Sequence, residues 1–173
     1  MKKIFLSLAF IASFNANASF TESSSDLLEF ALPAAAASIA YLVERDGEGL
    51  EQFGYSLGAT VLTTYALKTA VDKERPNGKD DDAFPSGHAA LTFSSAGFLH
   101  RRYGWQYALP AYLLAGYTGY ARVQTDNHEV VDVLAGAAIG LAFNHFIVSP
   151  HPDLAIAPYY DGETAGIVGQ FTF

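Results

Sequence analysis

The segment FPSGHAALTFSSAGFLHRRYG, residues 84–104, contains one complete helix with its start and stop signals. Ser86 stands where the helix begins, because a serine side chain can cap free backbone N–H groups. Gly104 follows the last turn, which is a usual position for a helix stop. The segment therefore predicts a helix that begins near Ser86 and ends around Tyr103.

Four more helical segments are legible on either side of this helix. They span about 24–44, 50–73, 105–121 and 128–148. The first has Asp26 or a nearby serine as its cap, glycines at 47 and 49 end it, and Pro150 and Pro152 close the last. We predict an all-α fold, a bundle of about five to six helices, in one domain over residues 19–150.

The tail of the chain, residues 151–173, changes character. Apolar residues alternate from Leu154 and again from Ile167 to Phe173, with a turn signal at Asp161-Gly162 between them. This pattern predicts a short C-terminal β-hairpin. One hairpin cannot close a barrel, so we interpret it as a local flap or an oligomer contact.

Residues 1–18 read as a signal peptide. Lys2 and Lys3 precede an apolar run over 4–14, and Ala16-Asn17-Ala18 supplies the small residues that signal peptidase needs. We expect cleavage after Ala18 and an exported chain. The alternative is an uncleaved anchor, for which the apolar run is short.

Composition leaves the membrane question open. Half of the 173 residues are hydrophobic, 16% are charged, and the mean hydropathy is +0.15. The segments at 50–73, 105–121 and 128–148 are near membrane-spanning length, are rich in small residues and have Tyr and Trp near their ends. We expect membrane embedding or close association. A soluble bundle with the same small residues inside is the alternative.

The charge excludes one class of partner. The formal net charge is −8, and a chain this acidic is a poor candidate for binding nucleic acid. Any phosphate must be captured by a local basic cluster. There are no cysteines, which excludes disulfides, zinc–thiolate sites and thiol catalysis.

The first motif that could carry chemistry is Lys68, six residues, then Arg75-Pro76. Lys68 and Arg75 are about two helical turns apart and would share a helix face, which Pro76 then ends. Two cations at a helix end suit an oxyanion. Most such pairs on a helix are simply solvated, so this motif alone decides little.

The second motif is Pro85-Ser86-Gly87-His88. The Ser86 hydroxyl and the free N–H groups near Gly87 point beyond the helix N-terminus, which makes an anion site. His88 lies beside it in the first turn. The alternative is an ordinary N-cap with an exposed histidine.

The third motif is Arg122, five residues, His128, three residues, Asp132. His128 and Asp132 are four apart on the predicted fifth helix. Asp132 can therefore hold one imidazole nitrogen and leave the other free to attack. Arg122 would stand on the loop just before. The alternative is a histidine–aspartate pair on a helix surface.

The combined pattern resembles the phosphatidic acid phosphatase type 2 (PAP2) superfamily, which also includes bacterial acid phosphatases and vanadium haloperoxidases. The family signature is Lys, six residues, Arg-Pro; then Pro-Ser-Gly-His; then Ser-Arg, five residues, His, three residues, Asp. All three motifs are present over roughly residues 50–145. One departure is Ala121, where the family has a phosphate-holding serine, so we expect weaker binding or altered substrate choice.

The resemblance implies a role for each motif residue. His128 would be the nucleophile that forms a phosphohistidine, Asp132 its orienting partner, and His88 the acid for the leaving group. The phosphate-binding residues would be Lys68, Arg75, Ser86, Gly87 and Arg122. We expect no metal and no cofactor, because the cations supply the charge that Mg²⁺ supplies elsewhere. The acidic run 80–82 is interpreted as a solvated loop, and His100, His145 and His151 as structural.

The leading hypothesis is a phosphatase acting on a phosphomonoester or diphosphate of a lipid, at the periplasmic face of the inner membrane. Candidate substrates are undecaprenyl diphosphate, phosphatidylglycerol phosphate, phosphatidic acid and lipid A. The main alternative is a soluble periplasmic acid phosphatase of broad specificity. A vanadium haloperoxidase and a non-catalytic phospholipid-binding membrane protein are more remote, and intact His88, His128 and Asp132 argue against the last. The sequence leaves the oligomeric state open.

Overall fold

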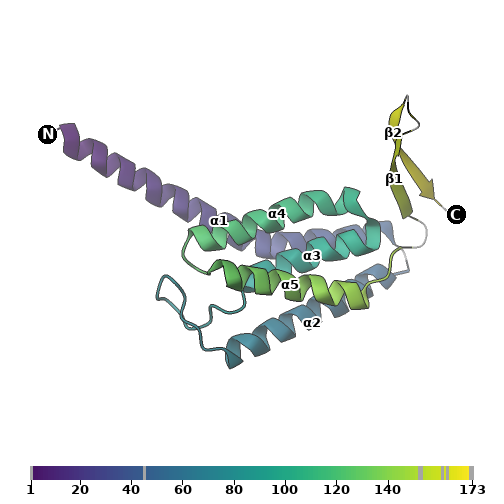
Figure 1. Cartoon of the computed structure of the whole chain (residues 1–173), viewed down its shortest axis with the longest axis horizontal. Helices are drawn as coiled ribbons and strands as arrows, with labels where there is room; N and C mark the ends of the chain where they lie inside the picture. The colour runs from purple at the N-terminus through teal and green to yellow at the C-terminus, as the bar shows by residue number, and fades with distance from the viewer. Residues whose placement is uncertain (1, 45, 152–153, 161, 163, 172–173) are drawn as a thin grey trace.

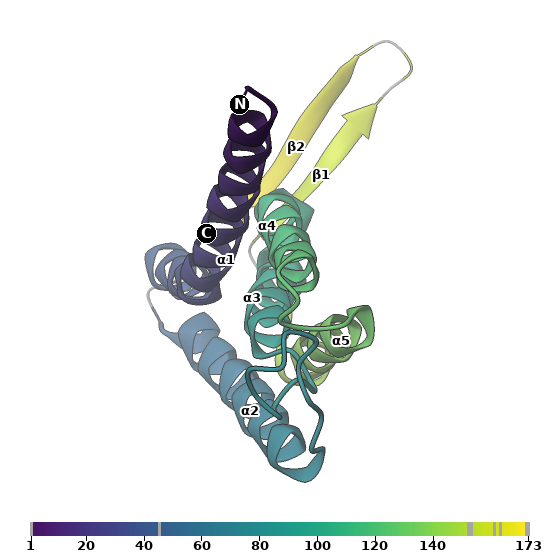
Figure 2. The ribbon, with the colours of Figure 1, turned by 90° about the vertical axis from the view of Figure 1, so that its left-hand side faces the viewer.

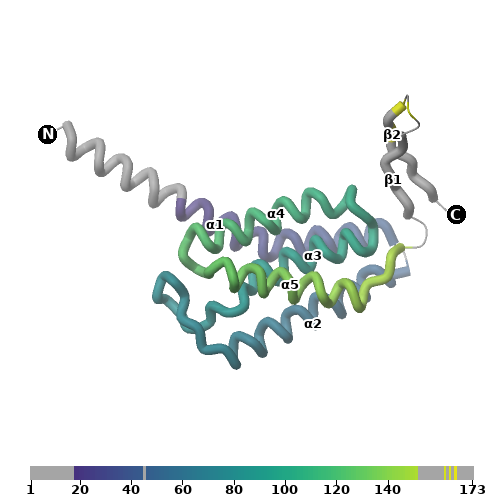
Figure 3. The backbone as a smooth tube through the Cα atoms, viewed as in Figure 1, coloured from purple at the N-terminus to yellow at the C-terminus, as the bar shows by residue number. Residues whose placement is uncertain are grey.

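Five helices and two strands follow one another in the part of the chain that the structure describes (Figure 1). The computed structural model describes all residues except 1, 45, 152–153, 161, 163 and 172–173, and it describes side chains over 18–151 (residue 45 apart) and at 162, 164 and 166 (Figure 3). The elements are α1 (Lys2–Val43), α2 (Glu48–Ala70), α3 (Gly87–Tyr103), α4 (Trp105–Gln124), α5 (Val130–Ile147), β1 (Leu154–Tyr160) and β2 (Ala165–Phe171). The predicted all-α bundle is confirmed.

Helix α3 is the centre of the bundle, and α1, α2, α4 and α5 all pack against it (Figure 2). Most of its residues are buried, and most of those are Ala, Ser, Thr or Gly. A Cβ atom on Gly136 of α5 would lie 2.3 Å from the Ser86 carbonyl oxygen, and one on Gly140 would lie 2.5 Å from that of Ala90. The small residues therefore let α5 approach the α3 backbone closely, as their recurrence in the sequence predicted.

The helices alternate in direction, so one end of the bundle collects all three motifs. The C-terminal ends of α2 and α4 lie with the N-terminal ends of α3 and α5, on the left in Figure 1, and the 71–86 loop runs beside them. Residues 22–29 of α1 reach the same end, since Asp26 pairs with Arg122 and with His88. The topology thus places helix ends together, as a shared phosphate site requires.

Several helix boundaries differ from the predicted ones. Helix α1 does not begin near residue 24 with Asp26 as its cap; it runs unbroken from Lys2, so Asp26 lies inside it. Helix α2 ends at Ala70 and α5 begins at Val130. The side chains of residues 1–17 lie outside the description, and cleavage after Ala18 stays a prediction. The proposed role of the tail hairpin, whose two strands pair antiparallel, also stays a prediction.

The outer helices present large apolar side chains to the surroundings. By length and composition, residues Ala18–Val43 of α1 and Val130–Ile147 of α5 could each cross a membrane. Of the three segments that the sequence favoured as spans, only α5 meets this test. Exposed large apolar residues occur on four helices, at Leu27, Phe30, Tyr41, Leu42, Tyr55, Leu62, Tyr65, Leu109, Leu113, Tyr120, Val130, Leu134 and Phe146. An interior of small residues under an apolar exterior is typical of helices packed within lipid.

Candidate active site

His128 lies in the loop between α4 and α5, and its side chain is buried. Its Nδ1 atom is 2.8 Å from the carbonyl oxygen of Ala83. Because a carbonyl oxygen can only accept, Nδ1 carries the ring proton and Nε2 keeps its lone pair. Within the described residues, no side chain or backbone group is hydrogen-bonded to Nε2. This is the tautomer that a nucleophilic imidazole needs.

Asp132 does not hold His128 by the predicted hydrogen bond. Its Oδ2 atom is 4.0 Å from the imidazole Nδ1, whereas Oδ1 accepts from Lys73 Nζ at 2.6 Å and Oδ2 from the Glu129 N–H at 2.8 Å. The reason is local: α5 begins at Val130, so His128 precedes the helix and the four-residue helical spacing does not apply. Asp132 closes the first turn of α5, and the Ala83 carbonyl orients the imidazole.

Lys68 and Arg75 meet through a loop and not along a helix face. Helix α2 ends at Ala70, and both cations contact Asp82, with Arg75 Nη2 at 2.7 Å from Oδ1 and Lys68 Nζ bonded to the backbone carbonyl. Burial raises the pKa of Asp82, but the hydrogen bond from Arg75 and the charge of Lys68 outweigh it and lower the pKa overall. Asp82 therefore holds two of the predicted phosphate-binding cations and is more than part of a solvated acidic loop.

Ser86 begins α3 as predicted. Its hydroxyl accepts from the Ala89 N–H at 3.4 Å, and its own N–H donates to the carbonyl of Asp132 at 2.9 Å. The first bond caps α3 and the second ties its start to α5. A Cβ atom on Gly87 would lie 3.9 Å from Lys68 Cε, so the N-terminus of α3 faces this lysine. The first two motifs are thereby adjacent in space.

Asp26 of α1 contacts both Arg122 and His88, the two predicted site residues that remain to be placed. Arg122 is on the last turn of α4, not on the loop after it, and its Nη1 donates to Asp26 Oδ1 at 2.9 Å. His88 Nε2 is 2.9 Å from the same oxygen and 3.1 Å from Glu29 Oε2. The Arg122 side chain is buried, and its Nε has no hydrogen-bond partner among the described residues. This donor is free for a ligand oxygen.

The charges of the motif cations act on both histidines. Burial, together with the charges of Arg75, Lys68 and Arg122, lowers the pKa of His128 to about 4, against the hydrogen bond that its Nδ1 donates to the Ala83 carbonyl. Burial also lowers the pKa of His88 to about 4, with Arg122 adding to the effect and Asp26 opposing it. Both imidazoles are therefore neutral near pH 7 in the ligand-free site. A bound phosphate dianion would raise both pKa values.

Comparison with known proteins identifies the family of this chain. The sequence profile of the PAP2 superfamily matches residues 50–154. The chain belongs to the PAP2 superfamily. A lipid A 4'-phosphatase of Helicobacter pylori is 33% identical over 146 residues, which is 78% of this chain and 73% of that protein. A lipid A 1-phosphatase of the same species is 31% identical over 118 residues, which is 63% of this chain and 62% of that protein.

A solved structure supports the fold of this PAP2 member. The crystal structure of Aquifex aeolicus LpxE superposes with a TM-score of 0.65 at 20% identity, over 77% of this chain and 86% of that one. The resemblance drawn from the three motifs is thus confirmed for the family and for the fold. Ala121, which replaces the family serine, is fully buried.

The α1 carboxylates and the Ala83 carbonyl that bind the motif residues were not identified from the sequence. Glu22, Asp26 and Glu29 are spaced by four and three residues, so they share one face of α1. That spacing could have identified an acidic stripe on one helix face. The predicted helix started at residue 24, however, and so left Glu22 outside it. Nothing in the sequence marks the Ala83 carbonyl. Lys73, which holds Asp132, stands inside the first motif and was passed over because its spacing is not part of the signature.

Proposed function

We propose that this PAP2 membrane phosphatase removes a phosphate from a lipid, with lipid A as its leading substrate, through a phosphohistidine on His128. The observation that carries the proposal is the His128 imidazole, whose Nδ1 is committed to the Ala83 carbonyl and whose pKa is lowered in part by the charges of three cations. The relatives that bear the names lipid A 4'-phosphatase and lipid A 1-phosphatase support the substrate class.

The reaction would run in two displacements. In the first, the His128 Nε2 lone pair forms a bond to phosphorus, the bond from phosphorus to the lipid oxygen breaks, and His88 gives that oxygen a proton. In the second, water attacks phosphorus, its proton passes to His88, and the nitrogen–phosphorus bond breaks to release phosphate. Both histidines return to their starting states.

Positively charged side chains would neutralise the negative charge of the phosphoryl group during its transfer. Lys68, Arg75 and Arg122, with the Gly87 N–H, would bind the phosphoryl oxygens, as electrostatic stabilisation of phosphoryl transfer requires. Within the described residues, no group of three or more His, Asp or Glu side chains is arranged to hold a metal ion. We propose that catalysis does not use a metal, because Lys68, Arg75 and Arg122 would supply the positive charge.

The active site would face the periplasm. After the predicted cleavage at Ala18, the new N-terminus would lie on the outer side of the membrane, and residues 22–29 of α1 lie at the active-site end of the bundle. An outward site beside the exposed apolar side chains of α1 and α2 would meet a lipid headgroup at the membrane surface.

Phosphate release from a substrate panel tests the substrate. The protein, purified in nonionic detergent, would be assayed with lipid A, phosphatidylglycerol phosphate, undecaprenyl diphosphate and the soluble p-nitrophenyl phosphate. We expect the highest kcat/KM for lipid A and no turnover by His128→Ala. Faster turnover of the soluble substrate, without dependence on detergent, would support the acid phosphatase alternative. Retained turnover by His128→Ala would assign another nucleophile.

Trapping the intermediate tests the chemistry. Acid-labile, base-stable phosphate should appear on the wild-type protein after rapid mixing with labelled lipid, and should be absent from His128→Ala. EDTA should leave the rate unchanged, whereas vanadate should inhibit. Loss of activity in EDTA that a divalent metal restores would refute the metal-free site.

A further inference from the structure

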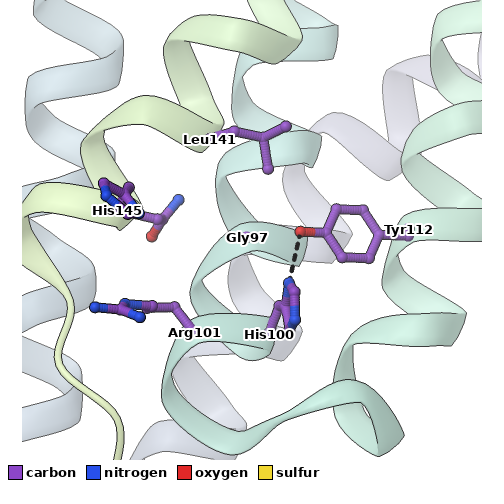
Figure 4. Close-up of a pocket in the computed structure, with 7 residues that line it drawn as sticks. Gly97, His100, Arg101, Tyr112, Leu141 and His145 are labelled. Atoms are coloured by element: carbon purple, nitrogen blue, oxygen red, sulfur yellow. Dashed lines mark hydrogen bonds between the residues drawn. The ribbon is translucent and has the colours of Figure 1, made fainter.

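A polar cavity lies at the end of the bundle opposite the active site; Figure 4 shows the residues that line it. It has a volume of about 290 Å³ and opens between the last turns of α3 and α5 and the side of α4. Its lining includes His100, Arg101, Tyr112, Leu141 and His145. His100 is twelve residues from His88 on the same helix, which places the cavity about 18 Å from the catalytic end. It is therefore separate from the phosphate site already described.

The chemistry of this cavity is basic. Its lining holds one arginine and two histidines but no carboxylate. Arg101 donates through Nε to the Val148 carbonyl at 3.0 Å, and no ion pair of its guanidinium occurs among the described residues. The neighbouring Arg102, in contrast, is buried and paired with Glu44 at 2.6 Å. In a chain with a net charge of −8, an arginine without a carboxylate partner beside two histidines is suited to an external anion.

The polar donors in the cavity are placed around its opening. In Figure 4, Arg101 and His145 lie on one side of it and His100 with Tyr112 on the other. The Tyr112 hydroxyl is 3.3 Å from His100 Nδ1, which fixes both side chains. A guanidinium can bind two oxygens of one phosphate, and the ring N–H groups and hydroxyl can donate to the others.

Apolar and aromatic surfaces next to the cavity indicate where its ligand comes from. Phe146 is 81% exposed and Trp105 is 60% exposed, and the Trp105 ring packs against the His100 ring with a tilt of 39° and 4.1 Å between the ring centres. Helix α5, whose end contributes His145, is one of the two helices that could cross a membrane. An exposed tryptophan beside basic residues at a helix end is typical of the membrane–water interface.

We propose that this cavity binds the phosphate of an anionic phospholipid, in the membrane leaflet opposite the active site. Arg101 would bind the phosphate oxygens and His145 would add a donor, while the acyl chains would lie against Phe146 and Leu141. Free phosphate has the same headgroup chemistry, but it would gain nothing from the exposed apolar surface. The bound lipid would join α3, α4 and α5 where they meet and stabilise the bundle.

Thermal unfolding in nonionic detergent tests the site. Phosphatidylglycerol at about one hundred times its Kd should raise the Tm of the wild-type protein by about 5 °C, whereas phosphatidylcholine and inorganic phosphate should not. The double variant Arg101→Gln, His145→Gln should lose most of this shift. Both side chains are exposed, so the variant should fold. Arg101→Lys keeps the charge and should retain part of the shift.

Arg122→Gln is the matched control, because it removes an arginine from the active site only. It should keep the full shift, which separates this proposal from the proposed function. Counting phosphatidylglycerol molecules bound to each variant by native mass spectrometry gives a second, independent measurement. An unchanged shift in the double variant, its loss in Arg122→Gln, or an equal shift with inorganic phosphate would each overturn the lipid site.

Discussion

Replacing Asp26 with asparagine should change the pH dependence of catalysis and lower KM. Asp26 Oδ1 is 2.9 Å from His88 Nε2 and 2.9 Å from Arg122 Nη1. Its charge favours the protonated form of His88, the form that would supply a proton to the leaving group in the proposed mechanism. The same carboxylate occupies the arginine that would bind phosphate. Asp26→Asn should therefore weaken the acid and free the phosphate-binding cation.

The size of the effect follows from distance and exposure. A carboxylate in contact with a histidine raises its pKa by about 1–3 units, and Asp26 is 52% exposed, so we expect the low end, about one unit. The pKa of His88 is already lowered to about 4 by burial, and losing Asp26 would lower it further. Above that pKa, each unit reduces the protonated fraction tenfold. The alkaline limb of kcat should move about one unit toward acid, with kcat near neutrality falling about tenfold.

Steady-state phosphate release over about pH 4 to about pH 9 measures both parameters. The control is Glu51→Gln, which makes the same change on an exposed glutamate of α2 that is hydrogen-bonded to Tyr55. An unmoved alkaline limb in Asp26→Asn would show that Asp26 does not act through His88. A raised KM would show that it does not compete with phosphate for Arg122.

Three further variants test the packing and the buried charges by thermal unfolding in detergent. Gly136→Ala should destabilise the protein by about 2 kcal/mol and slow turnover, because its Cβ would meet the backbone at the start of α3; Gly58→Ala, with no atom within 4 Å, should not destabilise. Lys73→Gln should cost about 2–4 kcal/mol, because it removes the cation from the buried carboxylate of Asp132. Glu44→Gln should cost about 3–5 kcal/mol by unpairing its buried arginine, with kcat of the folded protein unchanged. Equal Tm values for the two glycine variants, or an unshifted Tm in either charge variant, would contradict these estimates.

The sequence predicted the bundle well because helix periodicity and caps are local signals. The Ser86 cap and the small residues of α5 were both found where expected. The details of the site were less predictable, because they depend on where helices end. A shift of the α5 start by two residues moved His128 out of the helix, and its hydrogen bond went to Ala83 in place of Asp132. A backbone carbonyl supplied from another segment leaves no trace in a motif.

The acidic stripe on α1 explains how an acidic chain can keep a cationic site without a ligand. A buried arginine without a partner is strongly destabilising, so Arg122 needs a carboxylate when phosphate is absent, and Asp26 supplies it. Asp82 does the same for Lys68 and Arg75. Asp26 is half-exposed and can release Arg122 when a phosphate arrives while it stays beside His88. A phosphate dianion brings two negative charges to Arg122 and displaces the single negative charge of Asp26. A singly charged anion only replaces one negative charge with another, so it gains no electrostatic attraction. The ligand-free site should therefore bind phosphomonoesters in preference to phosphodiesters, and this preference should weaken in Asp26→Asn.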